Sequence, residues 1–288
     1  MMGHASNGVV LVSLAGRSAR TRFFLRWWHV VLHVAKMRTA AILLGLAVWL
    51  TATTGQPAPR PVTGRRFVVA LDPGHGGSNT GCHGHRVEEK ELTLRLAIEL
   101  RDELARRLPR AQVVLTRVGD DTMTLAERTA TANRVGADVL LSIHANASMA
   151  HDQTGFETFV LAPEIAEFDA TAGQGRGREV GAVERSSPVG AMLRELEYQT
   201  NRRRAAELAT SIQRQQAVRF PARANRGVRP GPFDVLMGAA MPAVLTEVGF
   251  LDHREEGADL MRPDVQAQIV DGLAEALVEY YRNLVRTD

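Results

Sequence analysis

The sequence contains little cysteine, no long apolar run and no excess of positive charge beyond its first residues. Cys82 is the single cysteine among 288 residues, so no disulfide can form within the chain. A domain of this length can bury a core large enough to be stable without one. The apolar run from Ala40 to Leu50 has about eleven residues, short of the roughly twenty that a membrane-spanning helix needs.

The positive charge is concentrated at the start of the chain. Residues 1–38 carry six of the 35 basic residues and no acidic one, which leaves 29 basic against 32 acidic residues in the remainder. The basic isoelectric point therefore belongs to the leader. A nucleic-acid-binding protein needs its positive charge on the folded surface, so we expect no nucleic-acid partner.

The leader has the pattern of a secretory signal peptide, with a positive start, an apolar run and a small, polar end. We assign the signal peptide to residues 37–58 and expect a periplasmic or extracellular protein. Residues 1–36 are either a leader extension or an untranslated stretch before a start at Met37; an uncleaved anchor is the alternative. A linker follows at 59–65, and the folded domain spans 66–287.

Strand-like and helix-like segments alternate along this domain. This pattern predicts a single α/β domain with a mostly parallel, roughly six-stranded sheet flanked by helices. The expected strands are 65–72, 111–117, 138–146, 155–163, 233–238 and 243–250, and the expected helices are 89–108, 124–137, 188–217 and 263–285. Residues 163–204 contain an insertion whose first half lacks any sustained period.

Chemically capable residues follow several of these strands. His75 lies in "LDPGHGG", where proline and glycines cannot continue a regular strand. His144 ends the third strand, Glu247 lies near the end of "AVLTEVGF", and Glu89 begins the first helix. Two histidines and one carboxylate suit a catalytic zinc ion with an open fourth position, and a second carboxylate is then needed as a general base. Spacing alone does not say which glutamate has which role.

The motifs "LDPGHGG", "EKELTLRLA", "LTR", "SIHAN", "GFETF", "NRGVR" and "MPAVLTEVGFLDH" occur in this order over about residues 66–285. The chain thereby resembles the zinc-dependent N-acetylmuramoyl-L-alanine amidases of the Amidase_3 family. The resemblance implies hydrolysis of the amide between N-acetylmuramic acid and L-alanine in peptidoglycan, for wall remodelling or daughter-cell separation. It implies Zn²⁺ as cofactor, with His75, Glu89 and His144 as ligands and Glu247 as the catalytic residue. The family's usual asparagine is replaced here by Thr93, which is not a ligand position.

Each assignment has an alternative. Glu88 competes with Glu89 as a ligand, and Glu247 has a rival interpretation as a plain buried strand residue. Burying an unpaired carboxylate is costly, which favours a functional role for Glu247. His83, His85, His151 and His253 are expected to be solvated or on the surface, and Cys82 is not expected to be a nucleophile. Asn146, Arg117 and Arg128 either support the ligands, contact the substrate or make structural hydrogen bonds.

Two other functions and one regulatory hypothesis stay open. A zinc exopeptidase is the first alternative function, although it would be expected to show more ligands for a second metal. A wall-binding protein without catalysis is the second. The resemblance also suggests that the insertion, residues 163–204, is a regulatory lid on which an activator protein acts. Val189, Met192, Leu193 and Leu196 would form its apolar helical face, Glu195 is a residue that could cap the zinc, and the alternative is a solvated surface excursion.

Overall fold

Residues 65–84, 87–162 and 188–286 are the part of the chain that the computed structural model describes. The predicted leader and signal peptide lie outside these residues, as does the first part of the predicted insertion, 163–187.

The centre of the sheet is made of apolar parallel strands. β1 (Val68–Pro73), β3 (Val139–Asn146) and β6 (Ala243–Phe250) lie side by side, and almost every residue in them is buried. β2 (Gln112–Leu115) pairs in parallel with β1 at one edge. Continuous apolar runs are what strands covered on both faces require. Because the strands are parallel, their carboxyl ends meet at one edge of the sheet.

The other edge of the sheet is built differently. β4 (Phe156–Leu161) runs antiparallel to β6, and β5 (Asn225–Gly231) pairs in parallel with β4. The sheet therefore has six strands in the order β2-β1-β3-β6-β4-β5. The predicted mostly parallel, six-stranded α/β fold is confirmed.

One predicted strand is wrong and one observed strand was not predicted. Residues 233–238 do not form a strand, because Asp234–Leu236 form a short 3-10 helix, η1. Its apolar residues Val235 and Leu236 are buried against the sheet rather than within it. The last strand before β6 is instead β5, whose sequence "NRGVRPG" lacks an apolar pattern. Pro230 is tolerated there because β5 is an edge strand with one pairing partner.

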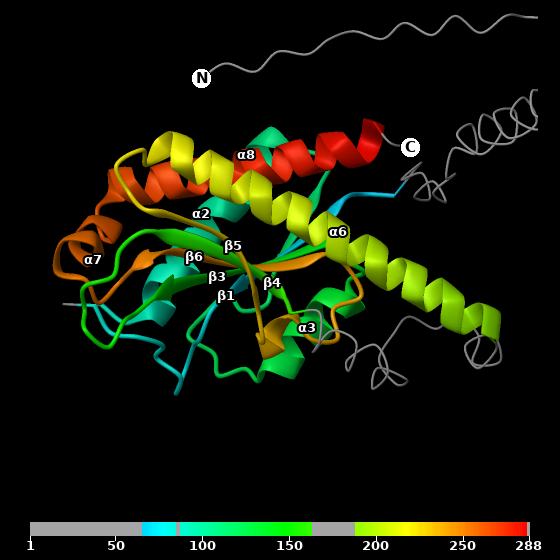
Figure 1. Ribbon diagram of the computed structural model, residues 1–288, viewed down its shortest axis with the longest axis horizontal. Coiled ribbons are helices and arrows are strands. Elements are labelled where there is room, and N and C mark those ends of the chain that lie inside the picture. Colours follow the sequence, from blue (N-terminus) through cyan, green and yellow to red (C-terminus); the bar gives the residue numbers. More distant parts are fainter. Residues whose placement is uncertain (1–64, 85–86, 163–187, 287–288) are drawn as a thin grey trace, which may run out of the picture. The chain divides into compact units, whose positions relative to one another are not determined.

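Helices cover both faces of the sheet (Figure 1). α2 (Glu89–Arg107), α6 (Pro188–Arg219) and α8 (Pro263–Arg286) share the larger apolar core with one face. α3 (Leu125–Arg134) and η1 lie on the opposite face, over a smaller apolar cluster. The short helix α7 (Arg254–Leu260) follows β6. None of the described helices combines the length and apolar character that crossing a membrane requires.

Local sequence signals set the ends of α3 near the site. Thr124 caps its first turn by accepting a hydrogen bond from the amide of Glu127, whose carboxylate in turn accepts one from the Thr124 amide. This reciprocal pair satisfies two amides that the helix itself leaves unpaired. Gly136, with a φ of 62°, ends the segment in the left-handed region that favours glycine. The first turn of α3 is thus fixed beside the carboxyl end of β1.

Candidate metal centre

The loop after β1 holds His75 in an uncommon backbone conformation. His75 has a φ of 61°, which non-glycine residues adopt mainly where surrounding contacts enforce it. Two arginines supply those contacts through carbonyl groups of the loop. Arg128 donates to the carbonyls of Pro73 (2.7 Å) and His75, and Arg117 donates to those of Pro73 (3.1 Å) and Gly74 (2.9 Å). Arg117 and Arg128 therefore set the backbone that carries His75.

A buried carboxylate anchors one of these arginines. Asp72 is fully buried at the end of β1 and accepts hydrogen bonds from Arg128 (2.9 Å), Thr116 (2.5 Å) and Ser142 (2.7 Å). The arginine's charge is paired with that of Asp72, so neither is buried uncompensated. This network connects β1, β2, β3 and α3 directly beneath the His75 loop.

Glu89 is the first residue of α2 and is almost fully buried. Its two carboxylate oxygens accept hydrogen bonds from the amides of Cys82 (2.9 Å) and Ala145 (3.1 Å). Burial opposes its ionisation, but hydrogen bonds with His144 and His75 outweigh burial and hold the pKa of Glu89 well below its usual range. Glu89 is thus an oriented carboxylate.

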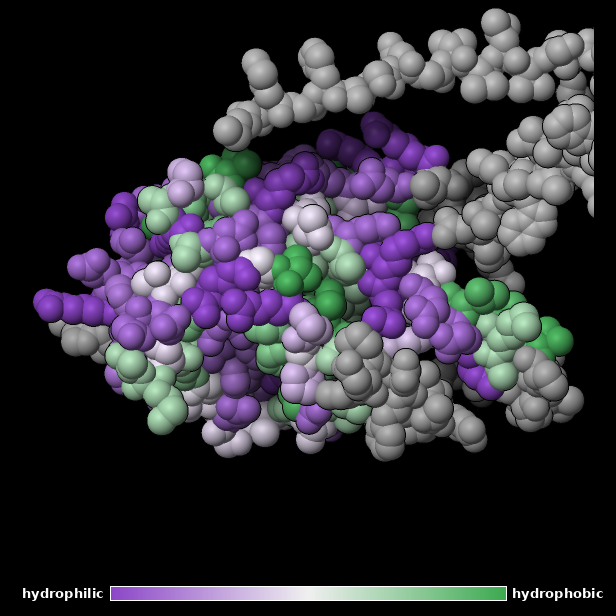
Figure 2. Space-filling model, in the orientation of Figure 1, coloured by the Kyte–Doolittle hydropathy of each residue, from purple (hydrophilic) through white to green (hydrophobic). Residues whose placement is uncertain are grey.

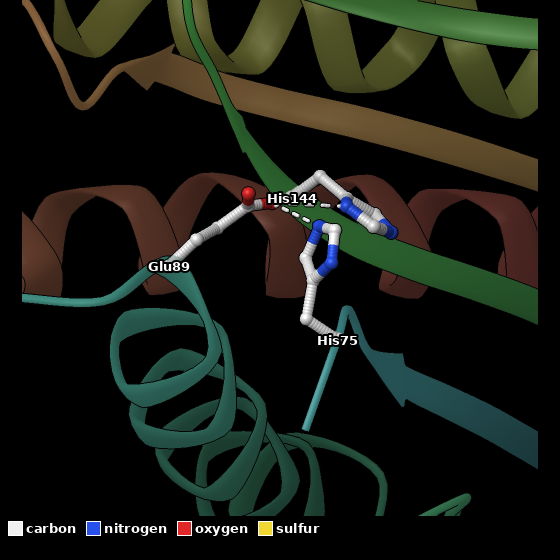
Figure 3. Close-up of side chains that lie close together, drawn as sticks. All are labelled: His75, Glu89 and His144. Atoms are coloured by element: carbon white, nitrogen blue, oxygen red, sulfur yellow. Dashed lines mark hydrogen bonds and ion pairs between the residues drawn. The ribbon is translucent and has the colours of Figure 1, made fainter. Parts of the chain in front are cut away.

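Both histidines point at the same oxygen of Glu89 (Figure 3). The Nε2 atom of His75 and the Nδ1 atom of His144 each lie 3.0 Å from Oε1 of Glu89. The pKa of His75 is raised, because its interactions with Glu89 exceed the opposing effect of burial. Gly74 leaves the space for this packing, since a Cβ atom there would lie 2.4 Å from the His144 ring.

The three side chains form a donor set that fits a metal ion. One ligand atom from each of His75, Glu89 and His144 lies within 4.8 Å of the others. Nδ1 of His75 lies 2.9 Å from the amide oxygen of Asn79, which orients the ring and leaves Nε2 facing the cluster. Two imidazoles and one carboxylate are a common set for a catalytic transition metal. The residues present therefore fit the metal that the sequence predicts.

Glu247 is a buried carboxylate on the strand next to that of His144. It lies on β6 directly opposite His144 of β3, and residues paired in this way project from the same face of the sheet. Its Oε2 atom is buried without a hydrogen-bond partner among the described residues. Burial, followed by the charges of Glu89 and Glu157, raises the pKa of Glu247 well above its ordinary value. A buried, unpaired carboxylate beside a metal cluster has the properties of a proton acceptor.

A cavity of about 270 Å³ opens beside the two histidines. Its lining includes Leu125, the first residue of α3, and Met123 and Thr124 just before it. The buried side chains of Asp72 and Arg128 also line this cavity, so the hydrogen-bond network of Asp72 shapes it. A substrate group next to the cluster can enter this space.

His83, His151, His253 and Glu88 are not members of the cluster. Glu88 precedes α2 and forms an ion pair with Lys90 at 3.3 Å, so the structure brings Glu89 and not Glu88 to the site. His83 is exposed and contacts Thr80, and His85 lies outside the described residues. The other two have structural contacts: His151 pairs with Asp252 at 2.7 Å, and His253 caps α7.

The remaining candidates make supporting hydrogen bonds. Asn146 donates to Glu157 at 2.7 Å, and Thr93 donates to the carbonyl of Gly74 at 2.8 Å. Burial is the largest of the effects that raise the pKa of Cys82, which opposes the thiolate that a nucleophile needs. Cys82 instead donates its thiol hydrogen bond to the carbonyl of Ala145.

Sequence reasoning missed four charged residues around the site: Asp72, Glu157, Arg226 and Arg229. Asp72 and Glu157 are buried carboxylates inside predicted strands, and that location is the signal that could have singled them out. The two arginines lie in the motif "NRGVR", but no pattern in the sequence places them beside Glu157, because that contact depends on the pairing of β5 with β4.

This fold and this His–Glu–His cluster define a protein of the α/β class with a candidate metal site. Comparison with known proteins agrees, because the family model described as N-acetylmuramoyl-L-alanine amidase, Amidase_3, matches residues 69–279. The chain belongs to this amidase family. It therefore hydrolyses the amide bond that joins N-acetylmuramic acid to L-alanine in peptidoglycan.

Individual relatives support the same assignment. The amidase CwlM of Bacillus licheniformis is 32% identical over 213 residues, which cover 74% of this chain and 68% of that protein. The amidase AmiA of Escherichia coli is 27% identical over 243 residues, covering 81% and 82%. The crystal structure of an N-acetylmuramoyl-L-alanine amidase from Clostridium difficile 630 has a TM-score of 0.58 and 27% identity. It covers 75% of this chain and 97% of that one.

Proposed function

We propose that this amidase is a zinc enzyme in which His75, Glu89 and His144 hold the metal and Glu247 moves the proton. The observation that carries the proposal is the convergence of the three side chains. They come from separate segments of the chain, yet their ligand atoms lie within 4.8 Å of one another. Three protein ligands with imidazole and carboxylate donors are typical of catalytic zinc.

Zinc, when bound, would supply the positive charge that stabilises the oxyanion formed when the amide carbonyl is attacked. The chain's own residues do the rest. His75 and His144 use one ring nitrogen each toward the metal, and Glu89 adds a negative charge that is held in place by two backbone amides. Glu247 takes the proton of the attacking water and gives it to the departing amine of L-alanine.

The described residues weigh against the exopeptidase alternative. Within 65–84, 87–162 and 188–286, His75, Glu89 and His144 form the one group of His, Cys, Asp and Glu side chains close enough to hold a metal. A second metal would need a second group of ligands. A single metal with one nearby carboxylate suits the amidase reaction.

Chelation and reconstitution test the metal. Hydrolysis of purified peptidoglycan is expected to stop when the full chain is treated with a chelator and dialysed. It is expected to return when one equivalent of zinc is added, and not when magnesium is added, because magnesium prefers an all-oxygen ligand set. Full hydrolysis by chain shown to be metal-free would overturn the zinc proposal.

We also propose that the protein is exported, with the folded domain at 66–287 after a signal peptide at 37–58. Support comes from the sequence pattern of the leader and from the location of peptidoglycan outside the cytoplasm. Expressing the full chain and determining the amino-terminal sequence of the mature protein tests this proposal. A cut within 52–58 is expected, and an uncut chain retained with the cytoplasmic fraction would contradict it.

For the insertion, 163–204, we propose a regulatory role in which an activator protein binds the start of α6. The two ends of this helix differ. Ala205, Leu208, Ala209 and Ile212 are buried in the core, whereas four apolar side chains near the other end are largely exposed (Figure 2). These are Val189, Met192, Leu193 and Leu196, with exposed fractions of 67, 66, 56 and 44%. Glu195, the candidate zinc cap, instead accepts a hydrogen bond from Gln199.

A further inference from the structure

A row of polar side chains extends from the metal cluster toward the β5 edge of the sheet. Glu247 is paired with His144 on one side and with Glu157 of β4 on the other. Directly opposed residues of neighbouring strands project from the same face, so these three side chains lie in line. The row ends at β5, where the Nε atoms of Arg226 and Arg229 lie 3.4 and 3.2 Å from Oε2 of Glu157.

The positive and negative side chains at the end of this row are unequal in number. Glu157 is a buried carboxylate that accepts a hydrogen bond from Asn146 on Oε1 and faces two guanidinium groups on Oε2. Each arginine has Glu157 as its ion-pair partner among the described residues. One carboxylate thus faces two cations, which leaves a positive charge over at the end of the row.

The two arginines differ in how much of their hydrogen-bonding capacity is used. Arg226 is mostly buried, lies over the Phe250 ring at 5.0 Å and donates to Gln153 at 3.0 Å. Arg229 has a half-exposed side chain, and its Nε atom donates to the carbonyl of Arg226 at 3.3 Å. Its terminal nitrogens donate to no other described residue. Arg229 is therefore an oriented guanidinium with its donor fork open to solvent.

Such a fork matches a carboxylate, because its parallel N–H groups can donate to both oxygens at once. The amidase substrate has carboxylates on one side of the bond that is cut. The muramoyl part has given its carboxyl group to that amide, whereas the peptide keeps at least the carboxylate of its carboxyl terminus. An arginine that binds a carboxylate on this side of the metal cluster would therefore contact the peptide part of the substrate and not the muramoyl part.

The spacing of the row agrees with a short peptide. Neighbouring strands lie about 4.8 Å apart, so β5 lies about 14 Å from β3. An extended peptide advances about 3.3 Å per residue, and an arginine side chain reaches back several ångströms. A carboxylate two to four residues beyond the scissile amide would thus reach Arg229.

We propose that Arg229, held in place by Glu157 and the Arg226 carbonyl, binds a carboxylate of the peptide part of the substrate. The inference rests on the proposed amidase function and adds the direction in which the substrate lies. The peptide extends over β6, β4 and β5, away from the cavity beside α3.

Matched substrates test this role. Two muramoyl peptides of identical sequence are compared, one with free carboxylates and one with carboxamides in their place. The wild-type chain is expected to favour the free carboxylates about tenfold in kcat/KM, through a lower KM. The reason is that a neutral carboxamide cannot accept the two charge-assisted hydrogen bonds that a carboxylate accepts from the guanidinium group. Arg229→Gln is expected to abolish this preference.

Two further variants make the comparison specific. Arg134→Gln, in an exposed arginine of α3 that forms no ion pair with described residues, is expected to keep the wild-type preference. Arg229→Lys keeps the charge but not the fork, and an intermediate preference is expected. Thermal unfolding checks that each variant is folded; if Arg229→Gln is not, Arg229→Lys decides. An unchanged preference in the folded Arg229 variants, or none in the wild type, overturns the inference.

Calorimetric binding of the free peptides to the full chain separates this inference from the amidase function. The carboxylate peptide is expected to bind the wild type about tenfold more tightly than it binds Arg229→Gln. If the wild type cleaves neither muramoyl peptide but shows this binding difference, the proposed function fails and the inference holds. If it cleaves both equally well and binds both peptides equally, the inference fails and the amidase function holds.

Discussion

The two sides of the sheet carry charged groups in opposite ways. On the β1–β3 side, the polar residues are enclosed, and each is fixed by several contacts: Asp72 accepts three side-chain hydrogen bonds and Glu89 accepts two backbone amides. On the β4–β5 side, the buried Glu157 is covered by arginines, of which Arg229 is half exposed. The first side is organised to hold side chains still, and the second leaves a charge accessible.

This difference follows from strand position. β1 and β3 are interior strands with neighbours on both sides, so their residues are fixed by pairing and by helices on the faces. β5 is an edge strand, and most of its residues are exposed or half-buried. A metal cluster needs rigid ligands, whereas substrate recognition needs groups that solvent and ligand can reach.

The largest expected effect concerns the β1–β3 side, where two adjacent glutamates can be compared: one is the proposed metal ligand and the other is not. Glu89→Gln is expected to lose bound metal and to reduce hydrolysis by roughly a thousandfold or more, because the cluster loses its only negative ligand. Glu88→Gln is the matched control and is expected to retain both. Metal analysis and peptidoglycan hydrolysis measure the two effects. Equal metal content in the two variants would remove Glu89 from the ligand set.

Glu247 lies on β6, between the two sides, and its substitution tests whether it moves a proton in the reaction or binds the metal. Glu247→Gln is expected to keep bound metal while kcat falls about a hundredfold or more, since glutamine cannot move a proton. The exposed Glu255→Gln serves as control and is expected to behave as wild type. Near-normal kcat in Glu247→Gln would exclude it from the reaction, and loss of metal would make it a ligand instead.

Stability is expected to differ between an enclosed and an exposed arginine. Arg128→Met leaves Asp72 as a buried carboxylate without its ion-pair partner, so the free energy of unfolding is expected to fall by about 3 kcal/mol. Arg229→Gln leaves Glu157 with Arg226 as a partner, and a loss under about 1 kcal/mol is expected. Urea denaturation of both variants gives the comparison. Equal losses would mean that the two sides of the sheet do not differ as described.

The smallest expected effect concerns the insertion. Replacing residues 164–200 with a short Gly/Ser connection is expected to raise peptidoglycan hydrolysis about threefold. A threefold rise follows if, without an activator, the insertion leaves the site accessible to substrate about a third of the time. Unfolding and zinc content of the variant are measured in parallel. Unchanged or lower hydrolysis in a folded, zinc-containing variant would show that the segment does not inhibit.

The interior of the fold was predictable because its patterns are local. The buried runs of β1, β3 and β6 and the apolar faces of α2 and α8 are visible in short windows of sequence. The two histidines of the cluster were predictable for a related reason: His75 and His144 follow or end such strands, and parallel strands bring their carboxyl ends together. The ligand role of Glu89 was implied only by the family resemblance.

The β5 edge was not predictable by the same reasoning. β5 has no apolar alternation, so 225–231 was missed, whereas the apolar residues of 233–238 pack against the sheet from a 3-10 helix and were mistaken for a strand. The row from His144 to Glu157 depends on the register between β3, β6 and β4. Register is a relation between distant segments, and no local pattern in those segments states it.

One measurement tests the central claim, that the His75–Glu89–His144 cluster holds the zinc for hydrolysis of the muramoyl–alanine amide. Purified full-length chain is analysed for zinc and incubated with purified peptidoglycan, and the released products are identified by mass spectrometry. We expect one zinc per chain and intact peptides that begin with a free L-alanine amino group, with neither obtained from His144→Ala. Products cut within the peptide or the glycan, or full zinc and full release in His144→Ala, would contradict the account.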